Sequence, residues 1–128
     1  MARPSDDIRE DLRRAYDSWN SAFNRGDADA VTALYTTDAI VLPSSHAFLK
    51  GLSAIKDFWM GLLSAGVRDH AVEMLGAEAA GDIAYSIGKW SAKAPGEDGR
   101  MQHYEGTIVT IFRYQDDRSW KACLHIWN

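Results

Sequence analysis

The sequence predicts an α+β fold in which three helices pack on one face of a strongly curved antiparallel sheet. Two observations support this prediction. Up to Gly66 the apolar residues recur mainly at helical spacing, whereas from Val67 onward they fall in long runs separated by turn residues. The chain has 128 residues, 46% hydrophobic and 25% charged, which is an ordinary globular composition. Such a chain suits a single domain over residues 1–128.

The first helix is predicted from its start signal, its apolar stripe and its stop signal. It begins near Pro4–Asp7, where Asp7 and Glu10 resemble a capping box, and it ends at Gly26, which can adopt a left-handed conformation. The apolar stripe consists of Ile8, Leu12, Ala15, Trp19, Ala22 and Phe23.

Two further helices and a short strand are predicted before residue 66. Asp27 is expected to cap a second helix whose apolar residues run to Tyr35 and which breaks at 36–38. A strand over 39–42, cut by Pro43, follows, with a second short strand around 47–49. The third helix opens at Gly51 and ends at Gly66, and its buried face is expected to hold Ile55, Phe58, Trp59, Leu62 and Leu63.

The second half is predicted to be strands separated by polar and glycine-containing turns. The strands are expected over 69–80, 83–94, 100–114 and 119–127. They are longer than the usual ~5–6 residues, which favours strong curvature of the sheet.

Composition excludes several classes of function. The net charge of −4 argues against nucleic-acid binding, and no apolar run approaches the ~18–20 residues of a membrane span. The N-terminus does not resemble a signal peptide, and a lone cysteine fits a reducing cytoplasm. We expect no metal and no cofactor, because the histidines lack metal-ligand spacing and the glycines form no phosphate loop.

Three segments of the chain resemble one family. The stretch 19–43, the segment 51–59 (GLSAIKDFW) and the segment 120–128 (WKACLHIWN) look like the opening, the third helix and the closing strand of SnoaL-like, ketosteroid-isomerase-like proteins of the nuclear transport factor 2 superfamily. The resemblance implies a cone, a bent sheet around a long helix with a largely apolar pocket inside. It also implies a homodimer formed through the outer sheet face. The superfamily includes enzymes of several classes and non-catalytic binding modules.

The resemblance fails at the positions of the isomerase machinery. That mechanism needs a carboxylate base, a tyrosine and a protonated acid, and ketosteroid isomerase is itself a standard worked case of it. In this sequence the matching positions hold Leu42, Trp19 and Thr110. Steroid-isomerase chemistry is therefore not expected.

His125 is the leading candidate for a catalytic or anchoring residue. The family's alternation points it inward with Cys123 and Trp127, and points Trp120, Ala122, Leu124 and Ile126 outward. Histidine titrates near neutral pH, which suits it to general acid–base catalysis. The alternative is a histidine satisfied by a neighbouring hydroxyl in a polar corner of the pocket.

Two weaker catalytic candidates are His46 and Tyr104. His46 lies in the loop after Pro43, near the expected mouth, where it either orients a ligand or is merely exposed. Tyr104 is placed inward by the family register, where it either donates to a carbonyl group or finds another partner. His70 opens a strand and is expected at the surface.

The expected pocket is lined by aromatic and small polar side chains, which are Trp19, Tyr35, Phe58, Trp59, Thr110, Phe112, Cys123 and Trp127. An alternative is that the tryptophans fill the cone and leave little cavity. Two functions follow. The first is binding of a small apolar or carbonyl-bearing ligand. The second is an isomerase, dehydratase or cyclase that uses His125 in general acid–base catalysis on a hydrophobic carbonyl compound.

Overall fold

The fold, seen in a computed structural model that describes residues 5–128 and the side chains from residue 8 onward, has three helices and six strands over this range. The helices are α1 (Ser5–Asn24), α2 (Ala28–Thr32) and α3 (Leu52–Ser64). The strands are β1 (Tyr35–Leu42), β2 (Leu49–Lys50), β3 (Arg68–Ala80), β4 (Ile83–Pro95), β5 (Met101–Tyr114) and β6 (Trp120–Trp127). The expected capping box at Asp7 lies outside the described side chains. The α+β class is confirmed.

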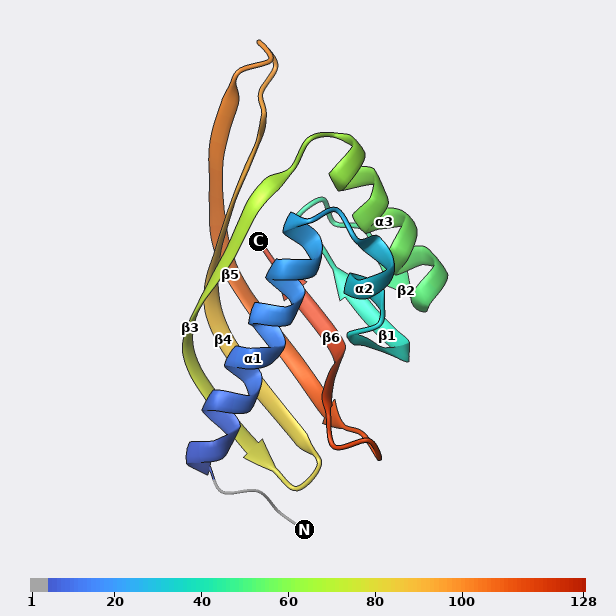
Figure 1. The fold of residues 1–128 in the computed structure, drawn as a ribbon, viewed down its shortest axis with the longest axis vertical. Helices are drawn as coiled ribbons and strands as arrows, with labels where there is room; N and C mark the ends of the chain where they lie inside the picture. The colour runs from blue at the N-terminus through green and yellow to red at the C-terminus, as the bar shows by residue number, and fades with distance from the viewer. Residues whose placement is uncertain (1–4) are drawn as a thin grey trace.

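The six strands form one mixed sheet in the order β2-β1-β6-β5-β4-β3. Neighbours from β3 to β6 are antiparallel, but β1 runs parallel to β6, so the expected wholly antiparallel sheet is wrong. The parallel pair arises because the chain crosses after α3 to the far edge of the sheet, where β3 lies. The following strands then return across the sheet, and the last of them, β6, lies beside β1. The three helices lie on one face of this sheet (Figure 1).

The second helix is shorter and the first strand longer than predicted. Helix α2 is capped as expected, since Asp27 Oδ1 accepts from Ala30 N at 3.0 Å, but it ends at Thr32. Tyr35 begins β1, so residues 36–38 lie in a strand instead of breaking a helix. Pairing with β6 decides this, because Ala122 N donates to Leu34 O at 2.9 Å and threonines suit a strand.

Helix α1 packs its predicted stripe against the sheet. The stripe residues Ile8, Leu12, Trp19, Ala22 and Phe23 are buried, together with Tyr16, which the stripe did not include. On α3 the buried residues are Ile55 and Trp59. The stripe and the inner sheet face together form the core of the protein.

The sheet separates an inner from an outer face by strict alternation along β4. Ala84, Ser86 and Gly88 are buried under the helices, whereas Tyr85 and Ile87 are exposed on the bare face. This alternation places every second residue of the strand toward the site described below.

On β6 the predicted alternation is partly wrong. Trp120 and Ala122 were expected outward but are buried in the core. The pairing with β5 shifts between Ile111 and Phe112, which leaves Cys123 as an extra residue. An extra residue shifts the alternation by one position, so Ala122 before Cys123 and His125 after it are both buried on the inner face.

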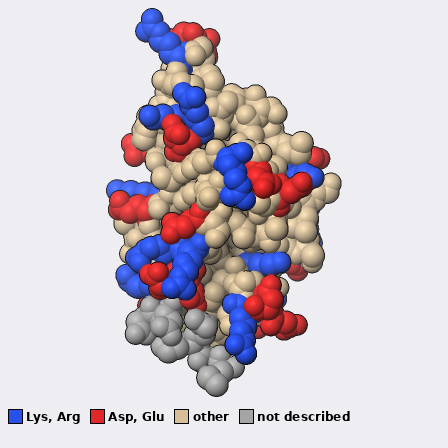
Figure 2. All heavy atoms as spheres, viewed as in Figure 1, with Lys and Arg blue, Asp and Glu red and all other residues tan. Residues whose placement is uncertain are grey.

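The surface has mixed charge. On the face seen in Figure 2, basic and acidic side chains are interspersed, and no large area carries one sign. In the described part of the chain, no helix is both long enough and apolar enough to cross a membrane.

Candidate functional site

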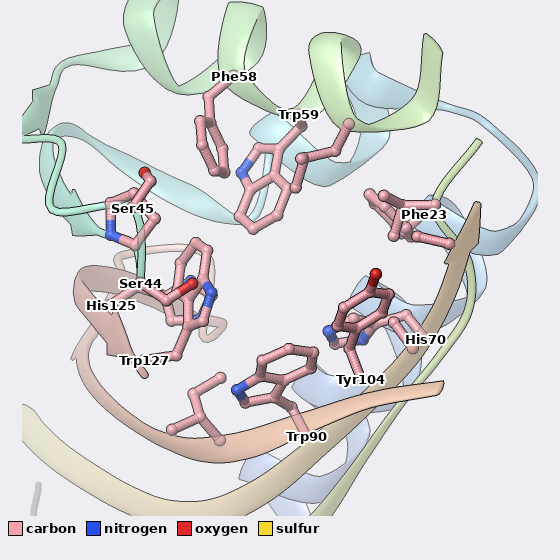
Figure 3. A pocket seen from close by; sticks show the side chains of 16 residues that line it. Phe23, Ser44, Ser45, Phe58, Trp59, His70, Trp90, Tyr104, His125 and Trp127 are labelled. Carbon is pink, nitrogen blue, oxygen red and sulfur yellow. The ribbon is translucent and has the colours of Figure 1, made fainter. Parts of the chain in front are cut away.

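A cavity of about 300 Å³ lies between α3, the loop after β1 and the inner sheet face. Phe58 and Trp59 reach into it from the helix, and Trp90 and Tyr104 from the sheet (Figure 3). A cavity of about 150 Å³ accepts benzene, so this one has room for roughly two fused rings. Its lining is mostly apolar, and the polar side chains that reach it are those of Ser44, Ser45, His70, Tyr104 and His125.

His125 is held by a chain of buried hydrogen bonds. Trp19 Nε1 donates to Tyr35 Oη at 3.0 Å, and Tyr35 Oη lies 2.8 Å from His125 Nδ1. The tyrosine oxygen thus accepts from the indole, and its own proton is free to point at Nδ1. An imidazole that accepts at Nδ1 carries its proton on Nε2. His125 is therefore a hydrogen-bond donor at Nε2.

Burial keeps this chain uncharged. Desolvation, with a smaller contribution from His70, lowers the pKa of His125 from 6.5 to about 3. Desolvation also raises the pKa of Tyr35 above its usual value of 10, so its hydroxyl stays protonated. Near neutral pH the site presents a neutral imidazole and a neutral phenol.

The second nitrogen of His125 has no partner. His125 as a whole residue is only 6% exposed, and among the described residues Nε2 finds no acceptor. The rings of Trp59 and Trp127 pack around it, with centroids 6.1 and 4.8 Å away. The buried Trp59 Nε1 also has no partner within strict hydrogen-bond geometry in this part of the chain, but it interacts with the hydroxyl of Tyr35. Buried polar atoms are almost always satisfied, so the unpaired Nε2 of His125, a residue that lines the cavity, indicates a place for an acceptor.

His70 also lines the cavity, so its expected surface position is wrong. Its ring packs against Trp19, with centroids 4.6 Å apart, and lies parallel to the ring of Trp90 at 6.3 Å. Nδ1 lies 2.6 Å from Asn20 Oδ1. Burial lowers the pKa of His70 from 6.5 to about 4.

The start of β3 turns His70 inward. Asp69 has a positive φ of 55°, and the pairing of β3 with β4 is irregular between Arg68 and Ala71. Asn24 then holds the His70 backbone at both ends, accepting from its N at 2.8 Å and donating to its O at 2.9 Å. A signal for this was present in the sequence, because Asn20 and Asn24 lie one turn apart on the same face of the helix. Asparagine is a poor helix former, so two of them at this spacing indicate a role in binding another segment.

The other catalytic candidates lie differently. Tyr104 lines the cavity but is 42% exposed, and its hydroxyl donates to Gln102 Oε1 at 3.4 Å. His46 is exposed in its loop and does not line this cavity, although Ser44 and Ser45 of the same loop do.

The predicted pocket residues divide between two cavities. Phe58, Trp59 and Trp127 line the large one. A second cavity of about 30 Å³, room for about one water molecule, lies deeper and is bordered by Trp19, Tyr35, Thr110 and Phe112. His125 borders both.

Cys123 lines neither cavity, because its thiol donates to the Ile111 carbonyl at 3.4 Å. The thiol thus provides a hydrogen-bond donor for a backbone carbonyl group at the point where the register between β5 and β6 shifts.

Beside the small cavity lies a polar cluster that the sequence did not reveal. Tyr16 Oη lies 2.5 Å from Ser86 Oγ and donates to Thr110 Oγ1 at 2.9 Å. Burial raises the pKa of Tyr16. Within the range 8–128, no three histidine, cysteine, aspartate or glutamate side chains come close enough together to hold a metal ion.

Comparison with known structures gives the fold. A ketosteroid isomerase-like protein from Erwinia carotovora atroseptica is 19% identical, with a TM-score of 0.81 over 92% of each chain. An NTF2-like protein with a cystatin-like fold from Novosphingobium aromaticivorans is 20% identical, with a TM-score of 0.77 over 93% of this chain and 79% of its own. An NTF2-like superfamily protein from Salmonella enterica is 12% identical, with a TM-score of 0.81 over 96% and 91%.

Sequence comparison gives the family. A search of curated protein sequences finds no significant match. The family model of the SnoaL-like domain matches residues 12–122, which is most of the chain. Because this match covers most of the chain, the chain belongs to the SnoaL-like domain family. The α+β fold that membership implies is the one formed by α1 to β6.

Proposed function

We propose that this protein binds a small, largely apolar ligand that carries a hydrogen-bond acceptor such as a carbonyl oxygen, and that His125 Nε2–H is the donor that anchors it. The observation that carries the proposal is the buried Nε2 of a cavity residue that has no partner. A single SnoaL-like domain over residues 1–128 and a cytoplasmic location are part of the same proposal, the latter because the one cysteine is unpaired.

The hydrogen-bond chain from Trp19 through Tyr35 prepares this donor. Because Tyr35 fixes the tautomer of His125, no proton has to move when a ligand arrives. A neutral donor in a poorly solvated site makes a stronger hydrogen bond than it does in water. Nε2 is covered by the aromatic rings around it, so binding requires the side chains of Trp59 or Trp127 to shift.

General acid–base catalysis by His125, in an isomerase, dehydratase or cyclase, has less support. A base needs a free lone pair, and the only lone pair of this imidazole, on Nδ1, faces Tyr35. As a neutral donor, His125 can still polarise a bound carbonyl group. Binding is the part of both functions that the geometry supports best.

The test compares indanone with indane, a hydrocarbon of the same shape, by titration of tryptophan fluorescence. We expect indanone to bind about three- to tenfold more tightly, the usual value of one neutral hydrogen bond. In His125→Leu this preference should disappear. His103→Leu is the matched control, since His103 is exposed and lines neither cavity. Equal affinities in the unaltered protein, or a preference that survives in His125→Leu, would contradict the proposal.

We also propose a homodimer formed through the outer sheet face. Four large apolar side chains are exposed there, Tyr85, Ile87, Val109 and Ile126, between 37 and 44% each. Ile87 pairs with Val109 and Val109 with Ile126, so three of them form a continuous row across β4, β5 and β6. A contiguous apolar patch on a bare sheet face is typical of a protein interface.

A further inference from the structure

We propose that His70 is a second polar anchor of the same site, one that accepts a hydrogen bond at Nε2, so that the cavity selects ligands carrying both an acceptor and a donor, such as hydroxylated ketones. This inference rests on the proposed function, because it needs a ligand held at His125.

Asn20 sets the tautomer of His70. Its Oδ1 lies 2.6 Å from His70 Nδ1, and an amide oxygen can only accept. The proton of the neutral imidazole is therefore on Nδ1, and Nε2 keeps its lone pair. No described residue donates to that lone pair, and the ring lines the cavity.

The ring of His70 is also held in place. Asn24 binds the backbone of His70 through two hydrogen bonds, and the ring packs against Trp19 on α1 and lies parallel to Trp90 on β4. A side chain fixed by its neighbours loses little rotational freedom when a ligand binds. His70 is thus arranged in advance, as His125 is.

The two histidines are chemically complementary. Both border the large and the small cavity, and the indole ring of Trp19 contacts both, with centroids 4.6 Å from His70 and 6.3 Å from His125. One presents N–H and the other a lone pair. A ligand with only a carbonyl group leaves His70 unpaired, whereas one that also carries a hydroxyl satisfies both. Sites with a buried polar group discriminate strongly against ligands that leave it unpaired.

The test uses indanone, the set of hydroxyindanones with the hydroxyl at each position of the aromatic ring, and their methyl ethers. We expect at least one hydroxyindanone to bind about three- to tenfold more tightly than indanone. Its methyl ether should lose the gain, because an ether cannot donate. In His70→Leu the hydroxyindanone should bind no more tightly than indanone binds to the same variant. The matched control, His103→Leu, should retain the gain.

Two further measurements separate anchoring from mere packing. Asn20→Leu removes the group that sets the tautomer and should reduce the gain from the hydroxyl without abolishing indanone binding. The nitrogen-15 NMR spectrum of the protein should show a protonated Nδ1 and an unprotonated Nε2 for His70. A protonated Nε2, or a methyl ether that binds as well as its phenol, would overturn the inference.

Failure of this inference and failure of the proposed function give different results. If indanone and all hydroxyindanones bind alike but still more tightly than indane, the role of His70 is wrong and that of His125 stands. If indanone shows no preference over indane, the proposed function is contradicted, and the inference falls with it.

Discussion

His125 and His70 make this protein sensitive to acid at two buried points. Both are neutral in the fold, with pKa values lowered from 6.5 to about 3 and about 4. The unfolded chain takes up protons at these residues below about pH 6.5, whereas the folded chain does not. Where the unfolded state binds more protons, stability rises with pH, so the contribution of each histidine is complete above pH 6.5 and is lost as pH falls toward 4.

We predict that the free energy of unfolding falls as pH drops from 7.5 to 5. Below pH 6.5 each of the two histidines contributes a loss of at most about 1.4 kcal/mol per pH unit. Urea denaturation at a series of pH values measures this. His125→Leu should show a shallower slope than the unaltered protein, and so should His70→Leu. Parallel slopes in all three proteins would show that other groups carry the pH dependence.

Tyr35 is the residue on which the tautomer of His125 depends. In Tyr35→Phe the buried Trp19 Nε1 loses its acceptor and His125 Nδ1 its donor. Leaving a buried polar group unpaired costs about 1–3 kcal/mol. We therefore predict a loss of unfolding free energy of about this size, measured by urea denaturation. Tyr104→Phe, which removes a hydroxyl from a 42% exposed residue, is the control and should change stability little.

At the scale of elements, the close approach of β3 and β4 depends on one glycine. A Cβ at Gly88 would lie 2.7 Å from the Glu73 carbonyl oxygen, on the neighbouring strand. Since that oxygen belongs to the backbone, the strands must move apart, at a typical cost of about 1–3 kcal/mol. The same β3–β4 pair carries His70 and Trp90, which face the site.

We predict that Gly88→Ala lowers the melting temperature and disturbs ligand binding. Gly61→Ala is the matched control, because Gly61 lies within α3 and a Cβ there meets nothing within 4 Å. That change should raise stability by about 0.5–1 kcal/mol, the usual gain from alanine in a helix. Equal thermal shifts in the two variants would mean that the strands accommodate the extra methyl group.

At the scale of the molecule, the helices cover one sheet face and leave the other bare (Figure 1). If the bare face forms the proposed dimer, sedimentation should give twice the mass of the chain. Val109→Lys should give the mass of one chain, because it buries a charge at the centre of the apolar row. Met60→Lys, the same kind of change on the exposed side of α3, should leave the dimer intact. An unaltered protein that sediments as a monomer would refute the interface.

The sequence by itself determined the features that depend on neighbouring residues. The stripe of α1, the cap at Asp27, the positive φ of Gly26 and Gly66 at helix ends, and the turns between β3 and β6 all follow local patterns. These patterns work because helical spacing, capping and turn geometry involve residues only a few positions apart. The roles expected of His125, Tyr104 and His46 in catalysis stay predictions.

The tertiary structure alone decided what faces the cavity and in which protonation state. Tyr35 belongs to a strand and not to a helix because it pairs with β6, 87 positions further along the chain at Ala122. Cys123 shifts the alternation of β6 by one position because the register with β5 shifts there. His70 faces inward, and His125 donates at Nε2, because partners from α1 and β1 hold them. The direction of a side chain and the position of its proton depend on contacts between distant segments, which no local pattern contains.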